Sequence, residues 1–258
     1  MSVQPDLIRL SVSEFRDRIR NDMVPLNSQF SYFVAGVPLS DDDLRDYLGD
    51  PVAAIPPSVV KMMPHVSILL VPFLEKTNGK EKKNSGTELV CFERPSNGKL
   101  TRSALWLDER AVVVAFGVQE MEVAEYHYEL YHQMAWLAAE MHSLEEMADF
   151  DGLLREELNL HVNGEVDERS WQKKQALTRR SGGVKRDSKS FREYAKQSFV
   201  DTMTLYLHGI CCDIDVETGP RQLPSRYLRK RLNVLKRMFA PPEGYAVFPE
   251  DQAAAEEA

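Results

Sequence analysis

The sequence has few cysteines and no long apolar run, and these two shortages exclude several classes of protein. Three cysteines in 258 residues, with Cys211 and Cys212 adjacent, cannot build a disulfide framework, which favours a reducing compartment. The longest apolar runs, at 66–73 and 111–116, are far shorter than the roughly 20 residues that cross a bilayer. The first 30 residues contain four acids and lack the apolar core of a secretory signal. We therefore expect a cytoplasmic protein with no membrane segment.

Motifs of several enzyme classes are also missing. No Walker A, G-x-G-x-x-G or G-x-S-x-G sequence occurs, so nucleotide-dependent enzymes and α/β-hydrolases receive little support. Thirteen glycines and fourteen prolines are too few for a collagen-like or wholly disordered chain. With 43% hydrophobic and 28% charged residues, the chain has the composition of a globular protein with a real core.

The net charge of −8 is unevenly distributed along the chain. Residues 169–192 hold nine Lys or Arg and one acid, a local balance of +8, so the rest of the chain carries −16. This distribution excludes a uniformly basic nucleic-acid binder. We expect a mobile basic loop between two helices. It is either simply solvated, or binds phosphate, or recognises an acidic partner through contact residues that include Arg179, Arg180, Lys185 and Arg186.

Hydrophobic periodicity separates a strand-rich part of the chain from a helical part. Short helices are expected at 11–22, 40–48 and 57–63. Strands are expected at 65–75, 88–93, 104–108 and 111–118. Helices are expected at 120–147, 151–158, 191–208 and 225–239. This order predicts an α+β fold, a small mixed or antiparallel sheet followed by a helical C-terminal half. We expect a helical segment at 1–56, the α+β domain at 57–248 and an acidic disordered tail at 249–258.

The first long helix after the strands carries the most specific chemistry. Tyr128, Glu129, His132 and Trp136 fall on the side opposite its apolar stripe. An exposed helix face usually holds Lys, Glu and Gln, so aromatic rings and a histidine there indicate a surface that something covers. His127 falls on the apolar stripe instead, and we interpret it as a core histidine with a hydrogen-bond partner.

Glu129 and His132 have the spacing of the second half of a His-Glu-x-x-His zinc motif. In that motif two histidines one turn apart bind Zn²⁺, and the glutamate polarises the metal-bound water. Tyr128 stands at the position of the first histidine, and His127 points roughly 140° around the helix from His132. A carboxylate ligand would have to come from a later helix.

The helix expected at 191–208 offers such a carboxylate. Tyr194, Asp201 and His208 recur every seven residues, which places them nearly in line along the axis, opposite an apolar stripe. Asp201 is the best candidate for a metal ligand on this helix.

Together these segments resemble the zinc-peptidase domains similar to the anthrax lethal factor catalytic domain, within the zincin group. The resemblance covers about residues 57–245, and three segments carry it. They are a strand pair followed by Tyr128-Glu-x-x-His132, then Phe199-Val-Asp201 on the later helix, and then Leu223-Pro-Ser-Arg-Tyr227 before a basic helix. Asp201 stands where that family has a glutamate ligand.

The resemblance implies a zincin-like fold with Glu129 as general base and His132 and Asp201 as zinc ligands. Tyr128, His127 or His208 would be an irregular additional ligand. The protein would then be a divergent zinc-dependent peptide hydrolase or a catalytically decayed derivative.

The alternative hypothesis is a non-catalytic protein-interaction module. Its cleft would hold a peptide or partner protein against Tyr128, Trp136 and Tyr194, and the basic loop would select an acidic partner. Nucleic acid is the least supported partner, because only Trp171 and Phe191 are interleaved with the basic residues for base stacking.

Overall fold

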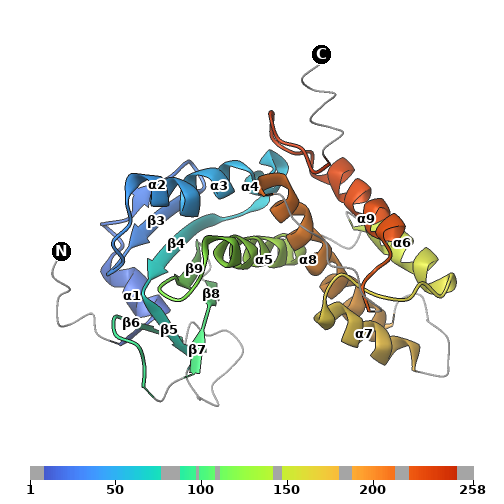
Figure 1. The fold of residues 1–258 in the computed structure, drawn as a ribbon, viewed down its shortest axis with the longest axis horizontal. Coiled ribbons are helices and arrows are strands. Elements are labelled where there is room, and N and C mark those ends of the chain that lie inside the picture. Colours follow the sequence, from blue (N-terminus) through green and yellow to red (C-terminus); the bar gives the residue numbers. More distant parts are fainter. Residues whose placement is uncertain are drawn as a thin grey trace. The chain divides into compact units, whose positions relative to one another are not determined.

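The computed structural model describes residues 9–76, 88–96, 99–107, 111–141, 147–179, 188–212 and 221–248. Helices and strands combine in an α+β fold with a helical C-terminal half, as the sequence predicts (Figure 1). The chain forms two compact units, Met1–Val52 with Met63–Gln133, and Ala53–Met62 with Met134–Ala258. None of the helices in the described ranges is both long enough and apolar enough to cross a membrane.

A five-stranded mixed sheet is the main element of the first unit. Its strand order is β2-β3-β4-β9-β8. The strands are β2 (Val24–Pro25), β3 (Phe30–Val34), β4 (His65–Val71), β9 (Ala111–Gly117) and β8 (Ser103–Leu107). β3, β4 and β9 run parallel to one another, and the two edge strands are antiparallel to their neighbours. The central strands β4 and β9 are almost continuously apolar, as strands covered on both faces usually are.

A second, antiparallel sheet has the order β1-β6-β5-β7. Its strands are β1 (Leu10–Ser11), β6 (Leu89–Cys91), β5 (Phe73–Lys76) and β7 (Lys99–Thr101). β5 follows β4 almost directly, so the chain passes from one sheet to the other there. Gly117 permits this passage, since a Cβ on it would lie 3.0 Å from the backbone nitrogen of Leu74.

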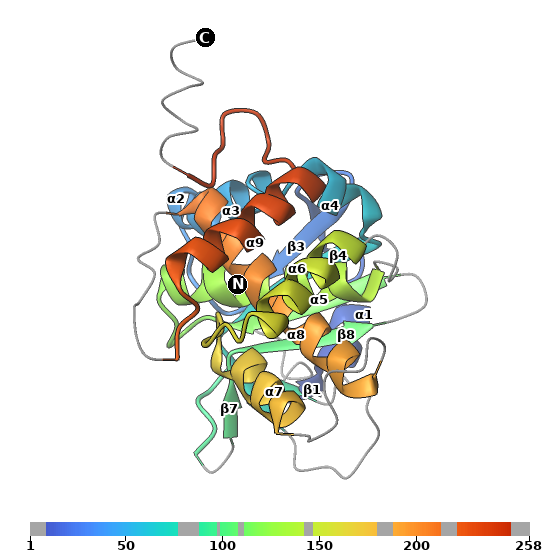
Figure 2. The same ribbon diagram turned by 90° about the vertical axis from the view of Figure 1, so that its right-hand side faces the viewer.

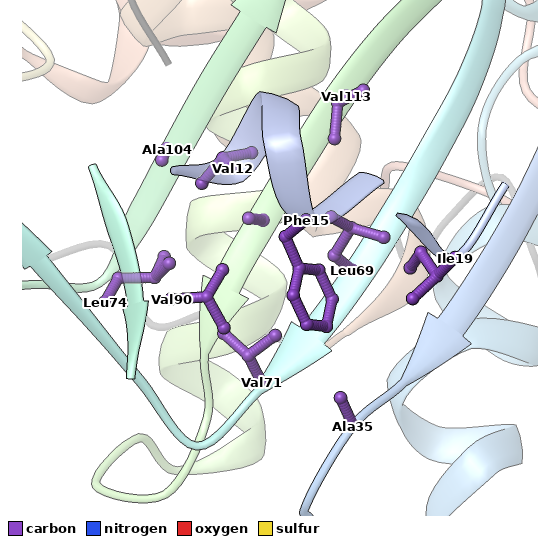
Figure 3. Packing of buried hydrophobic residues seen from close by; sticks show 11 residues of the cluster. Val12, Phe15, Ile19, Ala35, Leu69, Val71, Leu74, Val90, Ala104 and Val113 are labelled. Atoms are coloured by element: carbon purple, nitrogen blue, oxygen red, sulfur yellow. The ribbon is translucent and has the colours of Figure 1, made fainter. Parts of the chain in front are cut away.

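Helix α1 (Val12–Arg18) packs its apolar side on the β4–β9 region of the first unit (Figure 3). Ser11 begins the helix with a capping box, in which its hydroxyl accepts from the Glu14 amide and Glu14 reaches back to the Ser11 amide. Val12 and Phe15 are fully buried against Leu69 and Val113, so α1 closes this face of the sheet.

Short helical turns lead from β3 to β4. They are α2 (Asp41–Leu44), the π-helical turn η2 (Arg45–Gly49), α3 (Asp50–Ala53) and α4 (Pro57–Met62). Helix α5 (Val123–Met141) follows β9, and its residues up to Gln133 belong to the first unit. Phe116 of β9 contacts the ring of Tyr126 of α5, so α5 covers the sheet face opposite to α1.

The second unit is helical (Figure 2). Its main helices are α6 (Ala148–Asn159), α7 (Glu168–Thr178), α8 (Lys189–Cys211) and α9 (Ser225–Met238). α7 and α9 both pack against α8, and α6 packs against α8 and α9. α8 is therefore the central helix, and most of its side chains are buried.

A charged network lies inside this helical unit. Arg231 of α9 is fully buried and donates to both oxygens of Glu157, from Nε at 3.1 Å and from Nη2 at 2.5 Å. It also donates to Glu165, at 2.8 and 3.0 Å. Lys174 lies 3.0 Å from Glu165, and the Tyr194 hydroxyl donates to Glu165 at 2.5 Å. Two acids and two bases thus neutralise each other out of contact with water.

Several predicted boundaries differ from those of the structure. Residues 1–56, expected to be a helical segment, supply β2 and β3 to the main sheet. The first part of the basic loop expected at 169–192 is helix α7, because Asp167 caps it and Ser170 and Leu177 are buried. Residues 180–187 and the tail at 249–258 lie outside the described residues. The main sheet has both parallel and antiparallel pairs, which confirms the predicted mixed sheet.

Candidate functional site

Strand β8 is an edge strand, and within the residues that the structure describes no further strand pairs with its outer side. It pairs with β9 at the end of the five-stranded sheet. Its sequence, Ser-Ala-Leu-Trp-Leu, contains no charged residue and no proline. The opposite edge, β2, contains Pro25, which has no N–H to offer to a further strand. Sheets usually protect exposed edges with charge, proline or a covering element, so β8 is the edge at which another strand can add.

The ladder between β8 and β9 shows which backbone groups of β8 point outward. Gly117 donates to the carbonyl of Arg102 at 3.0 Å, so that pair exchanges hydrogen bonds. Bonded and non-bonded pairs alternate along an antiparallel ladder. Ala104 and Trp106 therefore bond to β9, whereas Leu105 and Leu107 direct their N–H and C=O groups away from it. Ser103 directs its backbone groups outward as well, but its carbonyl accepts from the Thr101 hydroxyl, so within the described residues Leu105 and Leu107 supply the free edge.

Helix α5 covers the face of the sheet that Phe116 lines, and it contacts Ser103 at the start of β8. The Ser103 hydroxyl donates to Glu129 Oε2 at 2.7 Å. Gln133, one turn further along α5, donates to the Ser103 hydroxyl at 3.0 Å. Glu129, predicted to be the general base, is thus fixed to the edge strand. Arg102 and Glu125 form an exposed ion pair, with 2.6 Å between Nη2 and Oε1.

Tyr128 and His132 occupy the outer face of α5, as the sequence predicts. Their rings lie parallel, with centroids 6.3 Å apart and an angle of 8° between planes. Tyr128 is 39% exposed, and Leu107 of β8 is 45% exposed. The same unit therefore exposes the aromatic ring of Tyr128 and the apolar side chain of Leu107 in part to solvent.

His127 is a core residue with a hydrogen-bond partner, which confirms the sequence interpretation. It is buried, and its Nε2 lies 2.7 Å from the carbonyl oxygen of Asp46. One turn along α5, the Tyr131 hydroxyl donates to the Pro51 carbonyl at 3.0 Å. These contacts attach α5 to the turns that precede β4.

Asp201, the predicted carboxylate ligand, performs a structural task in the second unit. It is only 4% exposed, and its Oδ2 accepts from the Ser170 amide at 3.2 Å. Its Oδ1 accepts from Gln197 at 2.8 Å. The carboxylate thereby satisfies an amide in the first turn of α7, where helix amides have no partner within the helix. Burial raises its pKa to about 6, although the hydrogen bonds from Gln197 and Ser170 act in the opposite direction.

The raised pKa makes the stability of this unit depend on pH. The folded chain takes up the Asp201 proton near pH 6 and the unfolded chain only near pH 4, so acidification favours the folded state. From about pH 7 to about pH 5, we expect this group to add roughly 1 kcal/mol to the free energy of unfolding. Urea denaturation of the native chain and of Asp201→Asn tests this. The difference in free energy of unfolding between the two proteins should change by that amount between pH 7 and pH 5. A difference that does not depend on pH would contradict the raised pKa of Asp201.

The other predicted cleft residues are distributed as follows. Tyr194 is fully buried and bonded to Glu165, so it does not line an open cleft. α7 packs on the side of α8 that the sequence assigns to the cleft. His208 is half-buried in the last turn of α8. Trp136 lies in the second unit, with Lys196 Nζ 5.7 Å from its ring centre. Arg179 is exposed at the end of α7, and Arg180, Lys185 and Arg186 lie outside the described residues.

The surroundings of Asp201 do not fit a zinc ligand. Each of its oxygens already accepts a hydrogen bond, from donors that hold α7 and α8 in place. A metal would have to replace these bonds inside a closed helical core. We therefore derive no step of a reaction through zinc.

Ser103, Leu105 and Gln133 are site residues that the sequence analysis misses. The strand itself is predicted, but whether a strand is central or at an edge depends on pairing between distant segments. Composition offers one signal for this site. The strand contains Leu-Trp-Leu and no charged residue, which is unusual for a segment at the surface.

No protein-family model matches this sequence, and no curated protein and no solved structure matches it either. The resemblance to zinc-peptidase domains therefore stays a prediction, and the function has to be argued from the site.

Proposed function

We propose that this protein is a non-catalytic interaction module that binds an extended peptide segment of a partner protein as a sixth strand along β8. The observation that carries the proposal is the free edge, at which Leu105 and Leu107 direct backbone donors and acceptors outward from a rigid sheet. Added strands gain affinity from these main-chain bonds and specificity from neighbouring side chains. Tyr128 and Leu107 supply such side chains.

The contacts of the predicted catalytic residues support binding without hydrolysis. A general base needs its carboxylate directed at a water molecule, whereas Glu129 accepts a hydrogen bond from Ser103. Asp201 is committed to α7. These contacts are the reason for preferring the interaction module to the divergent peptidase.

Proline substitution in β8 tests the proposal. Leu105→Pro removes one outward N–H without removing a ladder bond to β9, so the sheet should keep its pairing. Leu105→Ala removes the side chain and keeps the N–H, and is the matched control. Peptides selected on the native protein from a random phage-displayed library should bind Leu105→Pro at least about tenfold more weakly, and Leu105→Ala only severalfold more weakly.

Two outcomes would contradict the proposal. Equal affinity for the native protein and Leu105→Pro, with both folded by circular dichroism, would place binding elsewhere. Cleavage of a selected peptide that disappears in Glu129→Gln would instead identify the divergent peptidase.

A further inference from the structure

The side of helix α5 that borders strand β8 carries a carboxylate with unused hydrogen-bonding capacity. Gln133 donates to the Ser103 hydroxyl at 3.0 Å, and that hydroxyl donates to Glu129 Oε2 at 2.7 Å. Both bonds run toward Glu129, and this chain of donors ends at its carboxylate. Among the residues that the structure describes, no donor bonds to the second carboxylate oxygen, Oε1. Glu129 can therefore accept further hydrogen bonds from a bound partner.

A strand that adds to β8 places some of its side chains beside this carboxylate. Ser103 points to the α5 face of the sheet, where it meets Glu129. Leu105 and Leu107 point to the same face, because alternate residues of a strand share one. A peptide residue opposite Ser103 or Leu105 has its side chain on this face too, with the two Cβ atoms about 5 Å apart. A lysine or arginine at either peptide position is long enough to reach the carboxylate.

The charges on this side of α5 determine which peptide side chain suits the position. Two acids one turn apart, Glu125 and Glu129, lie toward β8, and Arg102 pairs with Glu125 at 2.6 Å. Within the described residues Glu129 has no such counter-charge. It is half-buried, so water screens its charge less than that of a fully exposed carboxylate. An added strand would remove more of this water, which favours a cation at that place and disfavours an apolar or acidic side chain.

We propose that the β8 site selects peptide strands with a lysine or arginine on the side that faces α5, and that Glu129 binds this cation. The inference rests on the proposed function, because it needs a strand paired with β8. It makes Glu129 a specificity-determining residue, where the sequence predicts a general base. Leu107 lies on the same face, 45% exposed, and favours an apolar peptide residue opposite it. The basic and the apolar residue of the peptide should therefore be separated by an even number of positions.

A double-mutant cycle tests the pairing of Glu129 with a peptide cation. Peptides are selected on the native protein from a random phage-displayed library, and those that Leu105→Pro binds more weakly are kept. These should be enriched in lysine or arginine at one position. Fluorescence anisotropy then compares the tightest of them with a copy in which glutamine replaces that basic residue.

Glu129→Gln keeps an acceptor for the Ser103 hydroxyl and removes the charge. It should weaken binding of the basic peptide by about fivefold or more, and that of the glutamine peptide by less than about twofold. Glu122→Gln is the matched control, because it removes the same charge from an exposed residue just before α5. It should bind both peptides within about twofold of the native protein. Circular dichroism checks that both variants are folded.

Three results would overturn the inference and leave β8 as the binding edge. The first is a set of β8-binding peptides with no enriched basic residue. The second is an equal loss for the basic and the glutamine peptide in Glu129→Gln, which would mean that Glu129 acts through its bond to Ser103 alone. The third is an equal loss in Glu122→Gln, which would mean that net charge alone matters. If Leu105→Pro weakens none of the selected peptides, the proposed function itself is contradicted, so the two failures are distinguishable.

Discussion

Replacing Arg231 by methionine is expected to lower the free energy of unfolding by about 3–5 kcal/mol. The substitution keeps much of the side-chain volume but leaves Glu157 and Glu165, both fully buried, without their shared cation. Glu165 retains Lys174, whereas every bond described for the Glu157 carboxylate comes from Arg231. Guanidinium chloride denaturation measures the loss.

Two further variants test whether the loss comes from the unpaired buried carboxylates. Arg237→Met removes an exposed cation from the same helix and should change the free energy of unfolding by less than about 0.5 kcal/mol. Adding Glu157→Met to Arg231→Met should recover part of the loss, because it removes the carboxylate that was left unpaired. A loss below about 1 kcal/mol in Arg231→Met, or no recovery in the double variant, would show that the network is not what holds α6 and α9 together.

The charged network also predicts sensitivity to acid. Burial by itself would raise the pKa of Glu165, but the charges of Arg231 and Lys174 outweigh it and hold the pKa at about 2. The ionised Glu165 therefore contributes its full stabilisation of the folded state above the unfolded-state pKa near 4.5. This contribution is lost as the pH falls toward 2. This loss lies below the window in which Asp201 titrates, so the two groups act in opposite directions at different pH values.

Gly164→Ala is expected to have the second large effect, a loss of about 3 kcal/mol or more. Gly164 has a φ of +86°, and a Cβ on it would lie 2.1 Å from the carbonyl oxygen of Gln222. The segment before α9 packs there, because the Glu165 amide donates to Arg221 and the Leu223 amide donates to Glu165. The new methyl group would separate these two segments and would also move the carbonyl that Lys174 binds.

Gly152→Ala is the matched control for this prediction. Gly152 lies in helix α6, and a Cβ on it would have no atom within 4 Å. Alanine should therefore stabilise the chain by about 0.5–1 kcal/mol, through better helix propensity. Thermal denaturation of both variants compares them directly, and similar effects at the two glycines would contradict the packing argument.

Local patterns predict much of this fold. Runs of apolar and β-branched residues identify β4, β8 and β9, and helical periodicity identifies all the long helices except α7. The five-residue strand β3 is missed, although it lies between β2 and β4 inside the sheet. Its order and parallel pairing depend on β4, thirty residues later, and no local pattern contains that information.

The candidate site is less predictable for the same reason. The outer face of α5 is read correctly from Tyr128 to His132, since helix periodicity alone fixes it. The sequence places Asp201 and Tyr194 opposite the apolar stripe, facing a cleft, because their seven-residue spacing aligns them there, whereas the structure buries both. α8 is covered by α7 on that side, and α7 lies in a segment whose charges predict a loop. Lys174 shows why the helix is missed. Its side chain is buried against Glu165, but in the sequence it counts as one more charge of a solvated loop.

Residue-resolved amide hydrogen exchange tests the central claim, peptide pairing along β8, most directly. The amides of Leu105 and Leu107 point away from β9 and should exchange fast in the free protein. A saturating selected peptide should slow their exchange by about tenfold or more, while Ala104 and Trp106, which already bond to β9, should change much less. Unchanged exchange at Leu105 and Leu107 in the peptide-bound protein would contradict the account.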